Sequence, residues 1–228
     1  MHPFSGIEPA APDFFARLAA DNGKTFWHAH LDEYRTTLRA PFESLLDDLS
    51  GVFGPWRTFR PQRDTRFSAD KSPYKTWISG VTHLPGGTTY YLRIDRHGLR
   101  VGAGYGWMAV DQLASFRAAI DDDASGRAFL ASVAEVEQGG DGGMRVSGGR
   151  QEGLKTAPRG YPHTHPRVVW LRVKGIDVSL DVGMPAWLAT PEASTEVLRC
   201  LQRSRPVTDW LDAHVGPTRL PPDPPRRR

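Results

Sequence analysis

Apolar side chains recur every three to four residues over the first fifty positions of the chain, and this spacing predicts two helical runs. Phe14 and Leu18 fall on one face of the first run. The second run extends over residues 27–49, where the apolar positions keep the helical spacing throughout. Pro41 interrupts this run, so we expect a kink or a break just before it and a new helix that has proline in its first turn.

After residue 55 the pattern changes to alternation of apolar and polar positions, which is typical of strands with one buried face. The alternation is clear over residues 90–95 and again over 99–103, on either side of Arg96-His97-Gly98. Two alternating runs joined by a short turn predict an antiparallel hairpin. Residues 176–182 alternate in the same way and predict the last strand.

Helical spacing returns over residues 110–120, in a short run after Gly126, and over 197–215. Residues 139–153 contain seven glycines and almost no apolar spacing, which predicts a flexible connection. Strands that cluster between helical ends, with hairpins in place of strand–helix alternation, indicate an α+β fold. We expect an antiparallel sheet with hairpins that packs against the N-terminal and C-terminal helices.

Composition favours one folded domain. Hydrophobic residues make up 39% of the 228 positions, and seven Trp, ten Phe and six Tyr supply a substantial core. We therefore expect a single α+β domain over residues 1–216 and a disordered Pro- and Arg-rich tail over 217–228. No run approaches the roughly 20 apolar residues of a membrane span, and a lone cysteine, Cys200, fits a reducing compartment. The expectation is a cytoplasmic protein without membrane association, of unknown oligomeric state.

The net charge of +3 resides in the tail, where four arginines face one aspartate. Residues 1–216 hold 25 basic and 25 acidic side chains. Because nucleic-acid-binding domains usually carry a basic face on the folded body, a neutral body argues against a nucleic-acid partner, except for weak binding through the tail.

One segment of the body departs from neutrality. Residues 57–75 carry six basic side chains against two aspartates. Converging guanidinium and ammonium groups would suit the phosphate or carboxylate of a small anionic ligand, and Ser68, Ser72 and Tyr74 would add hydroxyl donors. The candidate ligand-binding residues of this segment are Arg60, Arg63, Asp64, Arg66, Asp70, Lys71, Tyr74 and Lys75.

Two alternatives use the same segment. In an enzyme that acts on a phosphate-bearing substrate, Asp64 or Asp70 would serve as acid or base, and that carboxylate would stand unpaired among the cations. In a structural or interaction protein, both aspartates would pair with neighbouring arginines while Phe67 and Tyr74 pack inward, and the segment would be a loop clamp with no ligand. The sequence leaves the three hypotheses open and assigns no reaction.

A second candidate group follows the glycine-rich connection and comprises Lys155, Arg159 and Tyr161, with His163 and His165 close by. Its position suits a lid or a second wall of a pocket. Two histidines without a placed acidic or cysteine partner do not make a metal site, so we expect no metal.

Glycines at 102, 104 and 106 follow a hairpin and are not succeeded by the final glycine of a dinucleotide fingerprint. We expect no cofactor, and we interpret these glycines as positions of close backbone approach or of a strand bulge.

Residues 60–76 read R-P-Q-R-D-T-R-F-S-A-D-K-S-P-Y-K-T. This run resembles the hallmark of a family of conserved hypothetical proteins, the domain of unknown function 2461. Asn22-Gly23-Lys24 resembles the entry to its N-terminal helix, Gly102-Ala103-Gly104-Tyr105 its glycines after the hairpin, and Pro158-Arg159-Gly160-Tyr161 part of a later conserved stretch. The resemblance implies an α+β fold and no established activity.

Overall fold

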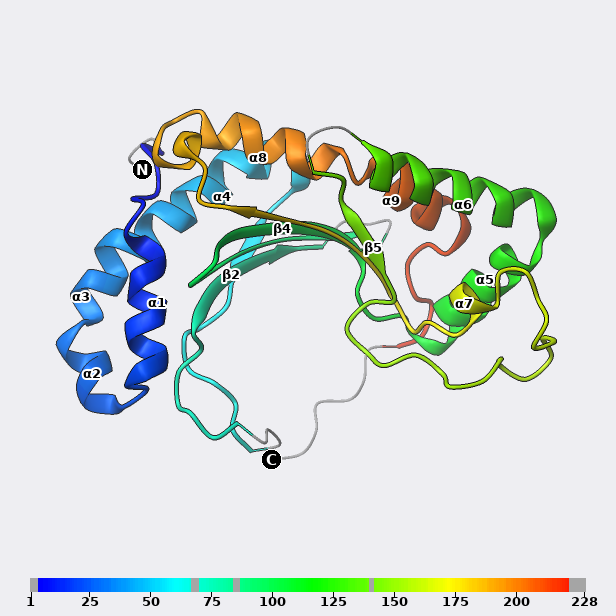
Figure 1. The fold of residues 1–228 in the computed structure, drawn as a ribbon, viewed down its shortest axis with the longest axis horizontal. Coiled ribbons are helices and arrows are strands. Elements are labelled where there is room, and N and C mark those ends of the chain that lie inside the picture. The colour runs from blue at the N-terminus through cyan, green and yellow to red at the C-terminus, as the bar shows by residue number, and fades with distance from the viewer. Residues whose placement is uncertain (1–3, 67–69, 84–86, 140–141, 222–228) are drawn as a thin grey trace. The chain divides into compact units, whose positions relative to one another are not determined.

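The computed structural model of the protein describes residues 4–66, 70–83, 87–139 and 142–221. Within these ranges, one sheet has the strand order β1-β2-β3-β4-β6-β5 (Figure 1). Its strands are β1 (Trp56–Thr58), β2 (Trp77–Thr82), β3 (Thr89–Asp95), β4 (Gly98–Tyr105), β5 (Arg145–Ser147) and β6 (Ile176–Gly183). Helices precede, interrupt and follow the strands, so the prediction of an α+β fold with an antiparallel sheet is confirmed.

The chain divides into two compact units. The first comprises Met1–His83, Tyr90–Gly102 and Ser179–Gln202, and the second comprises Leu84–Thr89, Ala103–Val178 and Arg203–Arg228. Strands β3, β4 and β6 each run from one unit into the other.

The helices of the first unit follow the predicted apolar spacing. In Figure 1, α4 and α8 lie side by side along one face of the sheet. The side chains of Phe42, Leu45 and Leu49 on α4 are almost fully buried, as the pattern predicts. The bounds are α1 (Ala11–Ala20), α2 (Lys24–Ala29), α3 (Leu31–Glu33), the π-helix η1 (Tyr34–Arg39), α4 (Ala40–Phe53), the 3-10 helix η2 (Ala186–Ala189) and α8 (Ala193–Gln202).

Pro41 lies in the first turn of α4, as predicted, but the chain remains helical before it. Pro41 has no amide hydrogen, and its ring would clash with the carbonyl four residues earlier in an α-helix. The backbone widens instead into the π-helix η1, where the amide of Ala40 donates to the carbonyl of Arg35, five residues back. The expected break is therefore replaced by a wider helical turn.

Gly51 lies inside α4, which continues to Phe53 and is followed by Gly54 with φ of +73°. A Cβ at Gly51 would meet no atom within 4 Å. Alanine restricts the unfolded chain and favours helix, so Gly51→Ala is expected to raise the free energy of unfolding by about 0.5 kcal/mol. Urea denaturation followed by circular dichroism tests this, and a destabilised variant would contradict it.

Register within the first unit fixes which side chains share a face of the sheet. Arg57 pairs with Val81, which in turn pairs with Tyr91. Opposite residues of antiparallel strands project to the same side, and so do residues two apart. The alternate positions form the other side, where Gly80 lies against Leu46 of α4. We call the side away from α4 the cationic face; it carries Arg57, Trp77, Ser79, Val81, Tyr91, Arg93 and Asp95.

The second unit corrects two expectations. A short helix was predicted after Gly126, but α6 begins at Asp123 because the carboxylate of Asp122 caps it by accepting from the amides of Ala124 and Ser125. The glycine-rich residues 139–153, predicted as a flexible connection, contain β5. The helices of this unit are α5 (Val110–Asp121), α6 (Asp123–Gln138), α7 (Val168–Leu171) and α9 (Arg205–His214).

The beginning of the predicted tail contacts α5 of the second unit, to which it belongs. The hydroxyl of Thr218 and the amide of Arg219 both donate to the carboxylate of Asp111, at 2.8 and 2.7 Å. Residues 222–228 lie outside the described ranges. None of the described helices has the length and apolarity needed to cross a bilayer.

Candidate functional site

The basic segment is closed at its base by backbone hydrogen bonds. The amide of Arg63 donates to the carbonyl of Pro73 at 2.8 Å, and the amide of Lys75 donates to that of Pro61 at 2.9 Å. Gln62 and Tyr74 form an antiparallel bridge between these two bonds. Residues twelve positions apart in the sequence are therefore held side by side, and we call the described residues between them, 63–66 and 70–73, the loop.

Tyr74 anchors this loop to the N-terminal helices. The side-chain amide of Asn22 donates to the Tyr74 carbonyl and accepts from the Tyr74 amide, both at 3.0 Å. The indole of Trp27 stacks on the Tyr74 ring, with centroids 4.4 Å apart and planes 11° apart. Tyr74 was predicted to offer a hydroxyl to a ligand, but its side chain is buried. Its observed contacts are those of a structural anchor.

Both aspartates of the loop have cationic partners. Asp64 accepts from Nε and Nη2 of Arg66 at 2.9 and 2.7 Å. Asp70 lies 3.1 Å from Nη1 of Arg63 and accepts from the amide and hydroxyl of Ser72. Hydrogen bonds from Arg66 hold the pKa of Asp64 well below its usual value, and those from Ser72 lower the pKa of Asp70. Neither is the unpaired carboxylate that the enzyme hypothesis requires.

The predicted convergence of five cations is realised in part. Arg66 pairs with Asp64, and the ammonium of Lys71 donates to the carbonyl of Thr65 at 2.8 Å. Two residues named in the sequence analysis, Phe67 and Ser68, lie outside the described ranges.

Arg60, Arg63 and Lys75 lie at the base of the loop, near enough for the charges of the two guanidinium groups to act on the ammonium of Lys75, and we call these three residues the cation cluster. Lys75 donates to the carbonyl of Arg60 at 2.5 Å. Burial lowers the pKa of Lys75, and the positive charges of Arg60 and Arg63 lower it further. Among the described residues, no carboxylate forms an ion pair with Lys75, and Nε of Arg63 is buried without a hydrogen-bond acceptor. Over the described ranges, Arg63 has an ion-pair partner in Asp70 and Arg60 interacts with the charge of Asp64, whereas the ammonium of Lys75 has no carboxylate partner.

Lys75 also belongs to a row of alternating cations and rings on the sheet. Its Nζ lies 5.6 Å from the ring centroid of Phe59 and 5.2 Å from that of Trp77. The guanidinium of Arg57 lies 4.9 Å from the Phe59 centroid, and that of Arg93 lies 5.2 Å from the Trp77 centroid. All are within the range of cation–π attraction. We call these five residues, Arg57, Phe59, Lys75, Trp77 and Arg93, the cation–ring ladder.

Comparison with known proteins places the chain in a family. Residues 10–210 match the family of conserved hypothetical proteins DUF2461. The chain belongs to the DUF2461 family. No curated protein and no solved structure matches it. The match includes the cation–ring ladder, the cation cluster and the Asn22 anchor, so the resemblance inferred from the sequence is confirmed, and the family description adds no activity to it.

The second candidate group of this DUF2461 protein lies in the second unit. Lys155 and Arg159 are exposed, and the Tyr161 ring contacts the imidazole of His165 edge-on, with centroids 6.5 Å apart. Nδ1 of His165 accepts from the amide of Arg167, and Nε2 lies 3.2 Å from the carboxylate of Asp121. Both imidazole nitrogens are therefore engaged. The described residues contain no group of three or more potential ligands that would hold a metal ion.

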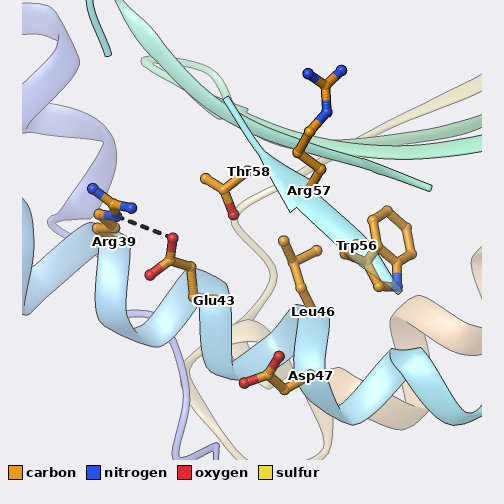
Figure 2. A pocket seen from close by; sticks show the side chains of 7 residues that line it. All are labelled: Arg39, Glu43, Leu46, Asp47, Trp56, Arg57 and Thr58. Carbon is orange, nitrogen blue, oxygen red and sulfur yellow. Dashed lines mark hydrogen bonds and ion pairs between the residues drawn. The ribbon is translucent and has the colours of Figure 1, made fainter. Parts of the chain in front are cut away.

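Sequence reasoning gave no sign of a cleft of about 420 Å³ between α4 and the edge strand β1 (Figure 2). Two of its charged side chains, Arg39 and Glu43, form an ion pair at 3.0 Å. Figure 2 shows that the Arg57 side chain extends away from α4, as expected for a residue of the cationic face. The lining residues are Arg39, Glu43, Leu46, Asp47, Trp56, Arg57 and Thr58.

Proposed function

We propose that this DUF2461 protein binds a small anionic ligand, phosphorylated or nucleotide-like, through its basic segment at residues 57–75. The observation that supports the proposal is the cation cluster. Burial and two neighbouring guanidinium groups disfavour the charged form of Lys75. A bound anion would supply the counter-charge that the described residues lack around this ammonium, and would reverse the unfavourable interaction.

The chemistry of the cluster suits phosphate. Arg60 is exposed and offers a planar fork of donors, whereas the Lys75 ammonium acts as a compact point charge. Arg63 already uses Nη1 on Asp70, which fixes the orientation of its guanidinium. Backbone bonds at the base of the loop hold Arg63 and Lys75 in place before any ligand arrives. Such preorganisation reduces the ordering cost of binding. We expect this binding to occur in the cytoplasm, where phosphorylated metabolites abound and Cys200 stays reduced.

The loop clamp is a second candidate, and the bidentate pair of Asp64 with Arg66 favours it. However, the side chain of Arg66 is 71% exposed and that of Asp64 is 47% exposed. Exposed ion pairs contribute about 0–1 kcal/mol, because water competes for both partners. The pair therefore adds little to the stability of the fold, and a clamp alone does not account for six basic residues in one segment.

Titration calorimetry with pyrophosphate tests the proposal. The wild-type protein is expected to bind, and Lys75→Ala and Arg60→Ala are each expected to lose at least about tenfold in affinity, because each removes a charge-assisted contact worth about 1.5–3 kcal/mol. Arg35→Ala is the matched control, since Arg35 is an exposed arginine of the same unit that pairs with Asp32.

Thermal melting of the same variants separates the two candidates. Anion binding by the wild type with melting temperatures of the variants close to that of the wild type supports the ligand site. If the wild type binds no anion and Lys75→Ala melts far lower, the segment is a clamp and the proposal fails. An equal loss of affinity in Arg35→Ala would also contradict it, because binding would then be non-specific.

A further inference from the structure

We infer that the ligand is a nucleotide whose phosphates lie at the cation cluster and whose base lies on the Trp77–Arg93 part of the cation–ring ladder. This inference rests on the proposed function and names the ligand class of that same site. It follows from the shared position of Lys75, from the planar groups beside it, and from the distribution of negative charge along the ladder.

Lys75 belongs both to the cation cluster, which suits phosphate, and to the cation–ring ladder, which contains aromatic rings. Its ammonium is close enough to Arg60 and Arg63 for their charges to lower its pKa, and it lies within 5.6 Å of two aromatic centroids. A ligand held by this ammonium therefore has both positive charge and aromatic rings close to it. Nucleotides combine these two features, an oligophosphate and an aromatic base, in one small molecule.

The surface beside Lys75 presents planar groups. Phe59, Trp77 and Arg93 are all partly exposed, and the Arg93 guanidinium lies over the Trp77 ring. Bases stack on aromatic side chains and on guanidinium planes in nucleotide-binding proteins. Inorganic phosphate and polyphosphate have no group that would use these planes. The rings thus favour a nucleotide over a plain oligophosphate.

The distribution of charged side chains along the ladder determines which end of the nucleotide lies at which end of the site. Arg93 pairs with Asp95 at 3.0 Å, so the Arg93 end of the ladder is close to neutral. Ser79, which lies two residues after Trp77 on β2 and opposite Arg93 on β3, is buried and its hydroxyl donates to the carbonyl of Leu92. Phosphate groups would therefore be attracted weakly to the Arg93 end. Their attraction to the cation cluster would be stronger, because Lys75 forms no ion pair with any described carboxylate there. The uncharged base therefore occupies the Arg93 end.

Calorimetric comparison of ADP with pyrophosphate tests the inference, because the two ligands share the diphosphate and differ in the nucleoside. ADP is expected to bind the wild type about tenfold more tightly, the gain typical of one stacked base. Trp77→Leu keeps an apolar side chain but removes the ring, and is expected to bring the ADP affinity within about twofold of that of pyrophosphate while pyrophosphate binds as before. Trp107→Leu, which alters a tryptophan that is 56% exposed in the second unit, is the control.

The outcomes separate this inference from the proposed function. Equal affinities of the wild type for ADP and pyrophosphate would overturn the nucleotide assignment and leave the anion site intact. Absence of binding to both would overturn both. A single strand of eight thymidines that binds far more tightly than ADP, and loses this advantage in Trp77→Leu, would overturn the small ligand in favour of a nucleic-acid strand. If Trp77→Leu does not fold, Trp77→Tyr replaces it, with a partial loss of the ADP advantage expected and no loss contradicting the inference.

Discussion

Replacing Gly104 with alanine is expected to lower the free energy of unfolding by about 3–5 kcal/mol. Gly104 lies in β4 with φ of +135°, a conformation that residues with a side chain rarely adopt. A Cβ there would lie 2.4 Å from the carbonyl oxygen of Ile176, which is backbone of β6 and has no rotamer by which to move away. The midpoint of urea denaturation, followed by circular dichroism, measures the loss.

Gly106→Ala is the matched control for this experiment. A Cβ at Gly106 would approach only the side chain of Arg150, at 3.4 Å, and that side chain is flexible. We expect a change of less than about 1 kcal/mol, in line with substitutions that meet no rigid neighbour. Equal destabilisation by the two substitutions would show that the close approach of β4 to β6 is not the cause. The sequence-based interpretation of these glycines as positions of close backbone approach is confirmed at Gly104.

Asn22→Ala is expected to lower the free energy of unfolding by about 2–4 kcal/mol. Its amide makes two hydrogen bonds with the backbone of the buried Tyr74, and removing the amide leaves one donor and one acceptor unsatisfied, at about 1–3 kcal/mol each. Because these bonds anchor the basic loop, Asn22→Ala is also expected to weaken pyrophosphate binding through Lys75. Thermal melting and calorimetry measure the two effects.

Asn22→Asp provides the graded control. A carboxylate accepts from the Tyr74 amide as the native side chain does, but it has no hydrogen to donate to the Tyr74 carbonyl. We expect a loss of stability between those of the wild type and Asn22→Ala. An aspartate variant as unstable as the alanine variant, or an alanine variant as stable as the wild type, would contradict the anchoring role.

Elements that bury one face left a clear trace in the sequence. The apolar spacing predicted α1, the β3–β4 hairpin, β6 and the two last helices, since one side of each packs inward. Strand β2 escaped prediction because five of its six residues are buried, so the run W-I-S-G-V-T shows no alternation. Strand β5 is only three residues long, and its glycine-rich surroundings mask it.

The positive charge of the candidate site could be predicted from the sequence, but the ion-pair partners within it could not. The excess of basic residues over 57–75 is visible in the sequence, whereas which arginine meets which aspartate depends on loop geometry. Arg66 forms an ion pair with Asp64, two residues before it, and Arg63 forms an ion pair with Asp70. Arg93 lies far along the chain and joins the site only through the register of β2 and β3, which places it diagonally across from Trp77.

The π-helix η1 sets a limit on how this protein can vary in length. Each of its hydrogen-bonded turns encloses one residue more than an α-helical turn. Deleting a single residue from Tyr34–Arg39 would let this turn return to α-geometry, and Leu46 would still face Gly80, because the wide turn and the shorter α-turn both complete one revolution. The ring of Pro41 would then clash with the carbonyl four residues earlier, which the wide turn avoids. Single-residue deletions in Tyr34–Arg39 are thus expected to destabilise the protein through Pro41, although they leave the orientation of α4 unchanged.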